Sequence, residues 1–159
     1  MGSDPGPPSS PATAPETLVE VLEQASHRHG GKVFAMAADG TSSLSFAALR
    51  AQAHALGRGL RRRGVTTRGG TVAILLPNCI SFLPVYFGIQ CAGAVAVPIN
   101  IRLKPAELEF ILNDCAAEAL FVHPRTWPAA NEALKAVPRI RHRVGVDFAK
   151  AEGLPEGLA

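Results

Sequence analysis

The stretch TVAILLPN, residues 71–78, is the part of the sequence that decides the fold class. It holds a continuous apolar run, Val72 to Leu76, which Pro77 and Asn78 bring to an end. A strand in a parallel sheet is covered on both faces, so it has a continuous apolar run rather than an alternation of apolar and polar residues. Two later stretches, AVAVPI at 94–99 and ALFV at 119–122, repeat this pattern, and residues 144–146 give a shorter version. The sequence therefore predicts several buried parallel strands.

Helical patterns fill the intervals between these runs. After the first run, apolar residues recur at helical spacing at Phe82, Val85, Tyr86 and Ile89. Pro84 is compatible with that helix if the helix begins near Ser81, where a backbone N–H is not needed. Two more helices are expected, one from Pro105 with Glu107 in its first turn, and one over residues 127–136. The alternation predicts an α/β domain with a largely parallel, doubly wound sheet flanked by helices.

The residues before the first run predict two helices and a hairpin. Thr17 is a candidate helix cap, and the apolar stripe after it comprises Leu18, Val21, Leu22 and Ala25. Residues 33–38 and 43–46 are expected to form strands on either side of a tight turn at 39–40. An amphipathic helix over 46–63 ends in three arginines, Arg61, Arg62 and Arg63, just before Gly64. Cations at that position oppose the negative end of the helix dipole, which gives the triplet a structural explanation; phosphate binding is the alternative.

These patterns divide the chain into three parts. Residues 16–148 are expected to form one domain. Residues 1–15 contain five prolines and no apolar core, so we expect a disordered tail, and we expect residues 149–159 to be unstructured as well. The first fifteen residues hold no secretory signal, so a cytoplasmic location is expected.

Composition and charge narrow the classes of function. The formal net charge is +3, but the positive residues are scattered apart from the arginine triplet and no aromatic residues lie among them. Nucleic-acid binding needs a basic stripe with stacking platforms, so no such partner is expected, although a small phosphate-bearing molecule remains compatible. Cys79, Cys91 and Cys115 form no CxxC pair, so no metal site is expected. Residues 69–101 carry no charge, but Pro77, Pro84 and Pro98 interrupt them, which argues against a membrane span.

Four motifs in this order resemble a known family. They are LSFAAL at 44–49, VAILLPN at 72–78, GIQCAGAVAVPIN at 88–100, and NIRL at 100–103 followed by ILND at 111–114. Together they are similar to the amino-terminal region of the adenylate-forming, AMP-binding enzymes, and the last one resembles the acyl–CoA ligase branch in particular. Four residues depart from the family pattern: Ala48 stands in place of Glu, Gly70 in place of Asp, and Cys115-Ala116 in place of Ser-Gly.

The resemblance implies an activity, and it also shows which motifs of the family have no match in this sequence. Members of the family convert a carboxylic acid and ATP, with Mg²⁺, to an acyl-adenylate, which coenzyme A then attacks. They hold the ATP phosphates in a Ser/Thr/Gly-rich loop ending in Pro-Lys-Gly, and a late lysine contacts the acyl carboxylate. The nearest string here, Gly30-Gly31-Lys32, follows a helix and is interpreted as a helix stop. We therefore assign no catalytic residue, and expect an N-terminal subdomain that is inactive as this chain alone and binds no cofactor strongly.

One residue is a candidate ligand contact. In some acyl–CoA ligases the arginine of an Asn-x-Arg-Leu segment lies against the nucleotide phosphates of coenzyme A, and the matching residue here is Arg102. A guanidinium suits phosphate geometry, although a solvated arginine after a strand is an equal alternative, and Lys104 is a weaker second candidate. The alternative function is a non-catalytic protein-interaction module. On either hypothesis the expected partners are the remainder of the ligase or a second copy of the chain.

Overall fold

The computed structural model describes residues 15–65 and 69–148, together with residues 155 and 158. Its centre is a four-stranded sheet of β3 (Thr71–Leu75), β4 (Val95–Pro98), β5 (Ala119–Val122) and β6 (His142–Gly145). The strand order is β4-β3-β5-β6, and all three neighbouring pairs are parallel. The predicted fold class, a doubly wound α/β arrangement, is confirmed.

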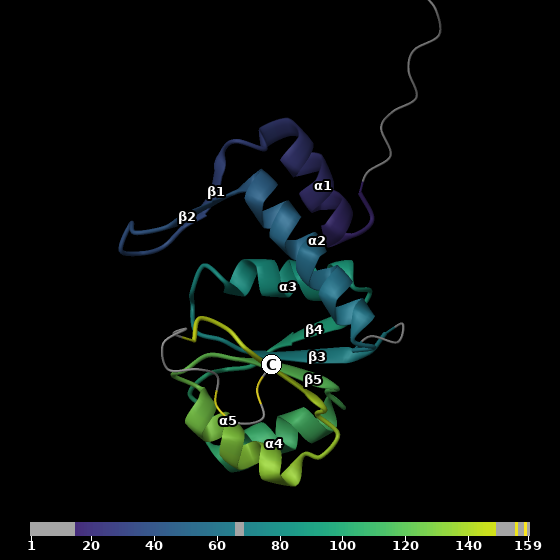
Figure 1. Ribbon diagram of the computed structural model, residues 1–159, viewed down its shortest axis with the longest axis vertical. Helices are drawn as coiled ribbons and strands as arrows, with labels where there is room; N and C mark the ends of the chain where they lie inside the picture. Colours follow the sequence, from purple (N-terminus) through teal and green to yellow (C-terminus); the bar gives the residue numbers. More distant parts are fainter. Residues whose placement is uncertain (1–14, 66–68, 149–154, 156–157, 159) are drawn as a thin grey trace, which may run out of the picture.

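Helices cover both faces of this sheet, as Figure 1 shows. One face is covered by α3 (Phe82–Cys91); the other is covered by α4 (Pro105–Asp114) and α5 (Trp127–Ala133), with a 3-10 turn at Leu134–Ala136. Side chains of β3 alternate between the two layers: Val72 and Ile74 pack on the α3 side, while Ala73 and Leu75 pack on the α4 and α5 side. Burial on both faces is the physical reason for the continuous apolar run at 72–76.

A further layer lies over the outer side of α3. It consists of α1 (Leu18–His29), the hairpin of β1 (Val33–Met36) and β2 (Ser43–Ser45), and α2 (Phe46–Arg62). Helices α2 and α3 approach closely at two glycines: a Cβ on Gly57 would lie 2.9 Å from the Cys91 Cβ, and one on Gly88 would lie 2.8 Å from the Leu56 Cβ. The close approach requires a residue without a side chain at both positions.

Several local predictions for this layer are confirmed. Thr17 caps α1, because its hydroxyl accepts a hydrogen bond from the N–H of Glu20 at 3.2 Å. Gly64 follows α2 with a φ of +66°, the left-handed conformation that glycine adopts without strain. The Arg61 guanidinium donates a hydrogen bond to the carbonyl oxygen of Cys91, which joins the last turn of α2 to the end of α3. For Arg61, the structural explanation of the arginine triplet is therefore supported.

Other predictions need correction. Strand β4 was expected to be buried, but it lies at the edge of the sheet and Val95 is 52% exposed. The α1 stripe is only partly covered, since Leu22 is buried while Leu18 and Val21 remain 46% and 44% exposed. Cys79, Cys91 and Cys115 are half-buried and free.

Element ends also shift from the predicted bounds. The first hairpin strand ends at Met36, the helix after Trp127 changes to a 3-10 turn at Leu134, and the last strand begins at His142. The predicted tails lie almost wholly outside the described residues. Within the described ranges, no helix is long and apolar enough to cross a membrane.

Candidate functional site

The candidate site is a cavity of about 580 Å³ at the carboxyl ends of β3 and β4. Its walls come from the segments that follow these strands and from the loop after β5: Leu76, Pro77, Asn78, Phe82, Pro98, Ile99, Asn100, Ile101, Arg102 and Arg125. In open parallel sheets the loops at this edge converge, and ligands bind there. The volume is within the range of small-molecule sites.

The loop after β4 brings Arg102 to the cavity. The Asn100 side-chain oxygen accepts a hydrogen bond from the Arg102 N–H at 3.0 Å, which holds the backbone in a tight turn just after the strand. The Arg102 side chain is exposed, and among the described residues no carboxylate lies within ion-pair distance of its guanidinium. Arg102 therefore lines the cavity with its charge unneutralised. Lys104, the weaker candidate, does not line it.

Arg125 is the residue that the sequence analysis missed. It follows β5 by three positions, in the loop that also contains His123 and Thr126. The Arg125 N–H donates to the His123 Nδ1 at 3.1 Å, and the His123 N–H donates to the Thr126 hydroxyl at 3.0 Å. The available signal was its position shortly after an apolar parallel strand, because ligands bind at the carboxyl ends of such strands.

Thr126 occupies the point where the strand order reverses, between β3 and β5. The chain leaves β3 toward β4 on one side and later returns to β5 on the other, which makes this the topological switch point of the sheet. The Thr126 hydroxyl donates to the Leu75 carbonyl oxygen at 2.7 Å, and the residue is only 4% exposed. The threonine thus closes the crevice between β3 and β5, and the cavity lies beside it, toward β4.

The lining of the cavity determines what it can bind. No aspartate or glutamate is among the described residues that line it, whereas Arg102, Arg125, Asn78 and Asn100 are. Phe82, Ile99 and Ile101 supply an apolar wall, and the Phe82 ring stacks on Tyr86 with centroids 6.1 Å apart. Guanidiniums match the geometry of phosphate oxygens. The arrangement suits an anion that carries an apolar or aromatic group.

Neighbouring titratable groups do not supply a nucleophile. Burial lowers the pKa of His123, an effect that Asp147 opposes and Arg125 reinforces, so the neutral imidazole is favoured. Burial also raises the pKa of the Cys79 thiol, and the Asp147 carboxylate adds to that shift. A protonated thiol is a poor nucleophile.

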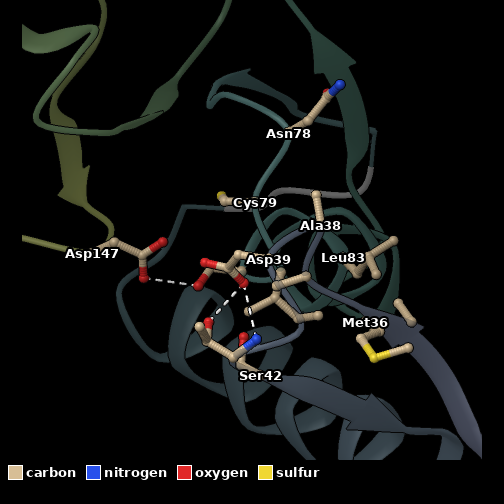
Figure 2. Close-up of a pocket in the computed structure, with 13 residues that line it drawn as sticks. Met36, Ala38, Asp39, Ser42, Asn78, Cys79, Leu83 and Asp147 are labelled. Carbon is tan, nitrogen blue, oxygen red and sulfur yellow. Dashed lines mark hydrogen bonds between the residues drawn. The ribbon is translucent and has the colours of Figure 1, made fainter.

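A second cavity, of about 630 Å³, lies between the β1–β2 hairpin and the start of α3 (Figure 2). Asp39 of the hairpin turn accepts hydrogen bonds from the Thr41 N–H and hydroxyl at 2.9 and 2.7 Å, which lowers the pKa of its carboxyl group. Asp147 accepts a hydrogen bond from the Ser81 hydroxyl at 2.8 Å. Two carboxylates and no cation among its described lining residues make this cavity unfavourable for phosphate.

Metal binding finds no support in the part of the chain that the structure describes. It contains no group of three or more His, Cys, Asp or Glu residues placed to hold an ion. Gly30-Gly31-Lys32, the nearest string to a phosphate loop, connects the end of α1 to the hairpin: the Lys32 N–H donates to His29 O, and Gly30 O accepts from the Ala47 N–H. These residues do not fit ATP or Mg²⁺.

The sequence and fold together define the class of protein. The family model described as AMP-binding enzyme matches residues 22–157, and the chain belongs to that family. The resemblance to the acyl–CoA ligase branch of the adenylate-forming enzymes is confirmed by curated relatives and by solved structures.

Individual relatives are acyl–CoA ligases that match over part of their length. The sulfoacetate–CoA ligase of Cupriavidus necator is 31% identical over 120 residues, which cover 76% of this chain and 23% of the relative. The feruloyl-CoA synthase of an Amycolatopsis species is 37% identical over 134 residues, covering 82% and 25%. The crystal structure of the anthranilate CoA ligase AuaEII with anthranoyl-AMP superposes with a TM-score of 0.75 at 30% identity, over 80% of this chain and 24% of that one. The chain thus spans about a quarter of the length of these relatives.

Proposed function

We propose that this chain is the amino-terminal part of an ATP-dependent acyl–CoA ligase, and that its cavity at the carboxyl ends of β3 and β4 binds the nucleotide phosphates of coenzyme A through Arg102. The observation that carries the proposal is Arg102 in a cavity of a chain that matches the AMP-binding family; within the described ranges it has no ion-pair partner, and no acidic residue lines the cavity. A phosphate group needs cationic, hydrogen-bond-donating partners, which this guanidinium supplies.

The proposed overall reaction activates a carboxylic acid in two displacement steps. A carboxylate oxygen attacks the α-phosphorus of ATP and displaces pyrophosphate, and the coenzyme A thiol then attacks the acyl carbon and displaces AMP. Relatives are named for acids as different as sulfoacetate and ferulate, so the reaction is proposed for carboxylic acids as a class. No step is assigned to ATP or Mg²⁺ on this chain, because Gly30-Gly31-Lys32 does not fit them.

The contribution proposed for these residues is therefore ligand binding. Arg102 and the apolar wall with Phe82 would hold the nucleotide end of coenzyme A, and the remaining chemistry would need residues beyond this chain. Three free cysteines are compatible with a reducing cytoplasm, which is the location we propose.

The test compares coenzyme A with its form lacking the 3′-phosphate by protein-observed NMR, on the wild type and on Arg102→Ala. Coenzyme A should bind more tightly than the shortened ligand, with millimolar affinity, and Arg102→Ala should reduce the difference. Lys104→Ala is the control, since Lys104 is exposed but outside the cavity. Equal affinities for both ligands in the wild type would contradict the proposal.

Exposed apolar side chains favour a second candidate, a protein-interaction module. Met36 and Val33 of the hairpin are 65% and 57% exposed, and Phe110 on α4 is 70% exposed. Apolar side chains in such numbers favour association with the rest of a ligase or with a second copy. Light scattering across a concentration series tests the second copy. A measured mass equal to that of one chain, at every concentration up to the millimolar range, would exclude self-association.

A further inference from the structure

The cavity described above is lined by one arginine more than the proposed contact uses. Arg125 lines it together with Arg102, although the two residues belong to different loops, after β5 and after β4. Neither side chain has an ion-pair partner within the described residues. Like charges on residues that line one cavity repel each other, and a bound anion would offset that repulsion.

We propose that Arg125 is a second binding residue of this site and that, with Arg102, it selects a doubly charged phosphate monoester over a singly charged phosphodiester. The inference rests on the proposed function, because it concerns the same cavity and the same class of ligand. A terminal monoester carries close to two negative charges at neutral pH, whereas a diester carries one. Two guanidiniums balance the two negative charges of the monoester, but they exceed the single negative charge of the diester.

The backbone around Arg125 is well enough fixed to support a specific contact. The N–H of Arg125 is held by His123, and the next residue, Thr126, is anchored to the Leu75 carbonyl oxygen at 2.7 Å. Thr126 is buried at the switch point, so the loop is tied directly to the central strand β3. A residue that is anchored in this way loses less conformational freedom when its side chain binds a ligand.

The charges around Arg125 predict how the selectivity depends on pH. A phosphate monoester gains its second charge near pH 6, so its affinity should rise as the pH passes through that value. His123 belongs to the Arg125 loop, and the charges of Asp147 and Arg125 both act on its imidazole. His123 becomes positive only as the pH falls, so it would strengthen anion binding at low pH. Asp147 accepts a hydrogen bond from the Ser81 hydroxyl at 2.8 Å. Because protonation of His123 acts in the opposite direction, an increase in affinity with pH would come from the ligand.

The experiment titrates the whole chain by NMR with adenosine 3′-monophosphate, a monoester, and with adenosine 3′,5′-cyclic monophosphate, a diester, at pH 5.0 and 7.5. The wild type should bind the monoester several-fold more tightly at pH 7.5 than at pH 5.0, and in preference to the diester. Arg125→Gln should lower monoester affinity at pH 7.5 by about tenfold, a typical loss for one charge-assisted contact. It should change diester affinity by less than threefold.

Arg139→Gln is the matched control. Arg139 is exposed and precedes β6, so it lies near the amino ends of the parallel strands, at the opposite edge of the sheet. It should leave both affinities unchanged, and Arg125→Lys should fall between the wild type and Arg125→Gln. Spectral dispersion and the thermal midpoint verify that each variant is folded.

Two patterns of failure are distinguishable. If Arg102→Ala reduces the preference for coenzyme A over its dephosphorylated form while Arg125→Gln behaves like Arg139→Gln, the proposed function stands and the role of Arg125 is wrong. If the wild type does not distinguish coenzyme A from that form, the proposed function fails. An equal loss of monoester and diester affinity in Arg125→Gln would also overturn the selectivity inference.

Discussion

The hydroxyl of Thr126 lies 2.7 Å from the carbonyl oxygen of Leu75 and donates a hydrogen bond to it across the switch point of the sheet. The same hydroxyl oxygen accepts the His123 N–H at 3.0 Å. One buried side chain therefore satisfies polar groups of two segments, the end of β3 and the loop after β5. This loop also carries Arg125.

Replacing Thr126 with valine keeps the volume but removes the hydroxyl. The Leu75 carbonyl and the His123 N–H would both lose a buried partner, so we expect the free energy of unfolding to fall by about 1–3 kcal/mol. Thr126→Ser keeps the hydrogen bonds and should cost about 1 kcal/mol or less, from one lost methyl group. Urea denaturation measures both. Similar losses in the two variants would show that the methyl group, rather than the hydroxyl, stabilises this junction.

The contact between α2 and α3 predicts opposite effects for three glycines. Gly57→Ala and Gly88→Ala place a Cβ within 3 Å of Cys91 and Leu56 atoms, so each should lower stability by about 1–3 kcal/mol. Gly59→Ala lies on the same helix as Gly57 with no atom within 4 Å of its Cβ, so it should raise stability by about 0.5–1 kcal/mol. Thermal unfolding of the three variants is the measurement, and a stabilising Gly57→Ala would contradict the close approach of the helices.

The backbone conformation of Ala116 predicts that replacing this residue with glycine stabilises the protein. Its φ is +51°, in the left-handed region that costs an alanine about 1–2 kcal/mol. Ala116→Gly should raise the free energy of unfolding by up to about 1 kcal/mol, after the greater entropy of the unfolded chain is deducted. Ala92→Gly is the control, because Ala92 has a φ of −77° and no such strain. An equal decrease in both variants would rule out strain at Ala116.

Glu23 ties α1 to α2 and should make stability depend on acid pH. Its carboxylate accepts hydrogen bonds from His54 and Arg50. Burial raises the pKa of Glu23, but these two partners outweigh it and leave the pKa below its ordinary value of 4.5. The stabilisation is therefore present above pH 4.5 and is lost as the pH falls through the lower folded value.

Glu23→Gln should accordingly lower stability at pH 7 by at most about 1 kcal/mol, because the partners are partly exposed. The difference from the wild type should shrink as the pH drops below 4.5. Denaturation curves between pH 3 and 7 measure this, with Glu109→Gln as a control that breaks no ion pair among the described residues. A constant difference across the range would contradict the ion pair.

The purified chain is expected to catalyse no acid-dependent exchange of pyrophosphate into ATP. Gly30-Gly31-Lys32 joins α1 to the hairpin through backbone hydrogen bonds and presents no phosphate loop. The assay uses ATP, Mg²⁺ and a panel of fatty and aromatic acids. Exchange above the no-acid background would contradict the assignment of no catalytic residue to this chain.

Local chemistry determined which parts of the fold could be predicted. The apolar run at 72–76, the cap at Thr17 and the glycine after α2 each act within a few residues, and the structure agrees with all three. The exposure of Val95 depends on strand order, which brings β4 to the edge and β5 beside β3. Arg125 joins the cavity for the same reason. Residues separated along the chain meet there through topology, which periodicity does not encode.

Two of the departures from the family motifs have structural consequences, one at a helix cap and one at a residue with positive φ. Ala48 is the third residue of α2, and its N–H donates to the Ser45 hydroxyl at 3.2 Å. A glutamate at that position would complete a reciprocal cap, so the alanine leaves half of it absent. Ala116, which stands where Gly is common, is one of two non-glycine residues with positive φ in the described part of the chain.

The pairing of β3 with both β4 and β5 has a consequence for how the chain folds as it is synthesised. Val72 pairs with Ala96 on one side and with Ala119 on the other, so β3 gains its second neighbour only after the residues near 122 have emerged. The layer of α1, hairpin and α2 uses nearer contacts and can form earlier. In that interval the apolar face of β3 is uncovered, and a nascent chain is then most prone to aggregate. Slowing translation before residue 119 should lower the soluble yield more than slowing it after residue 145.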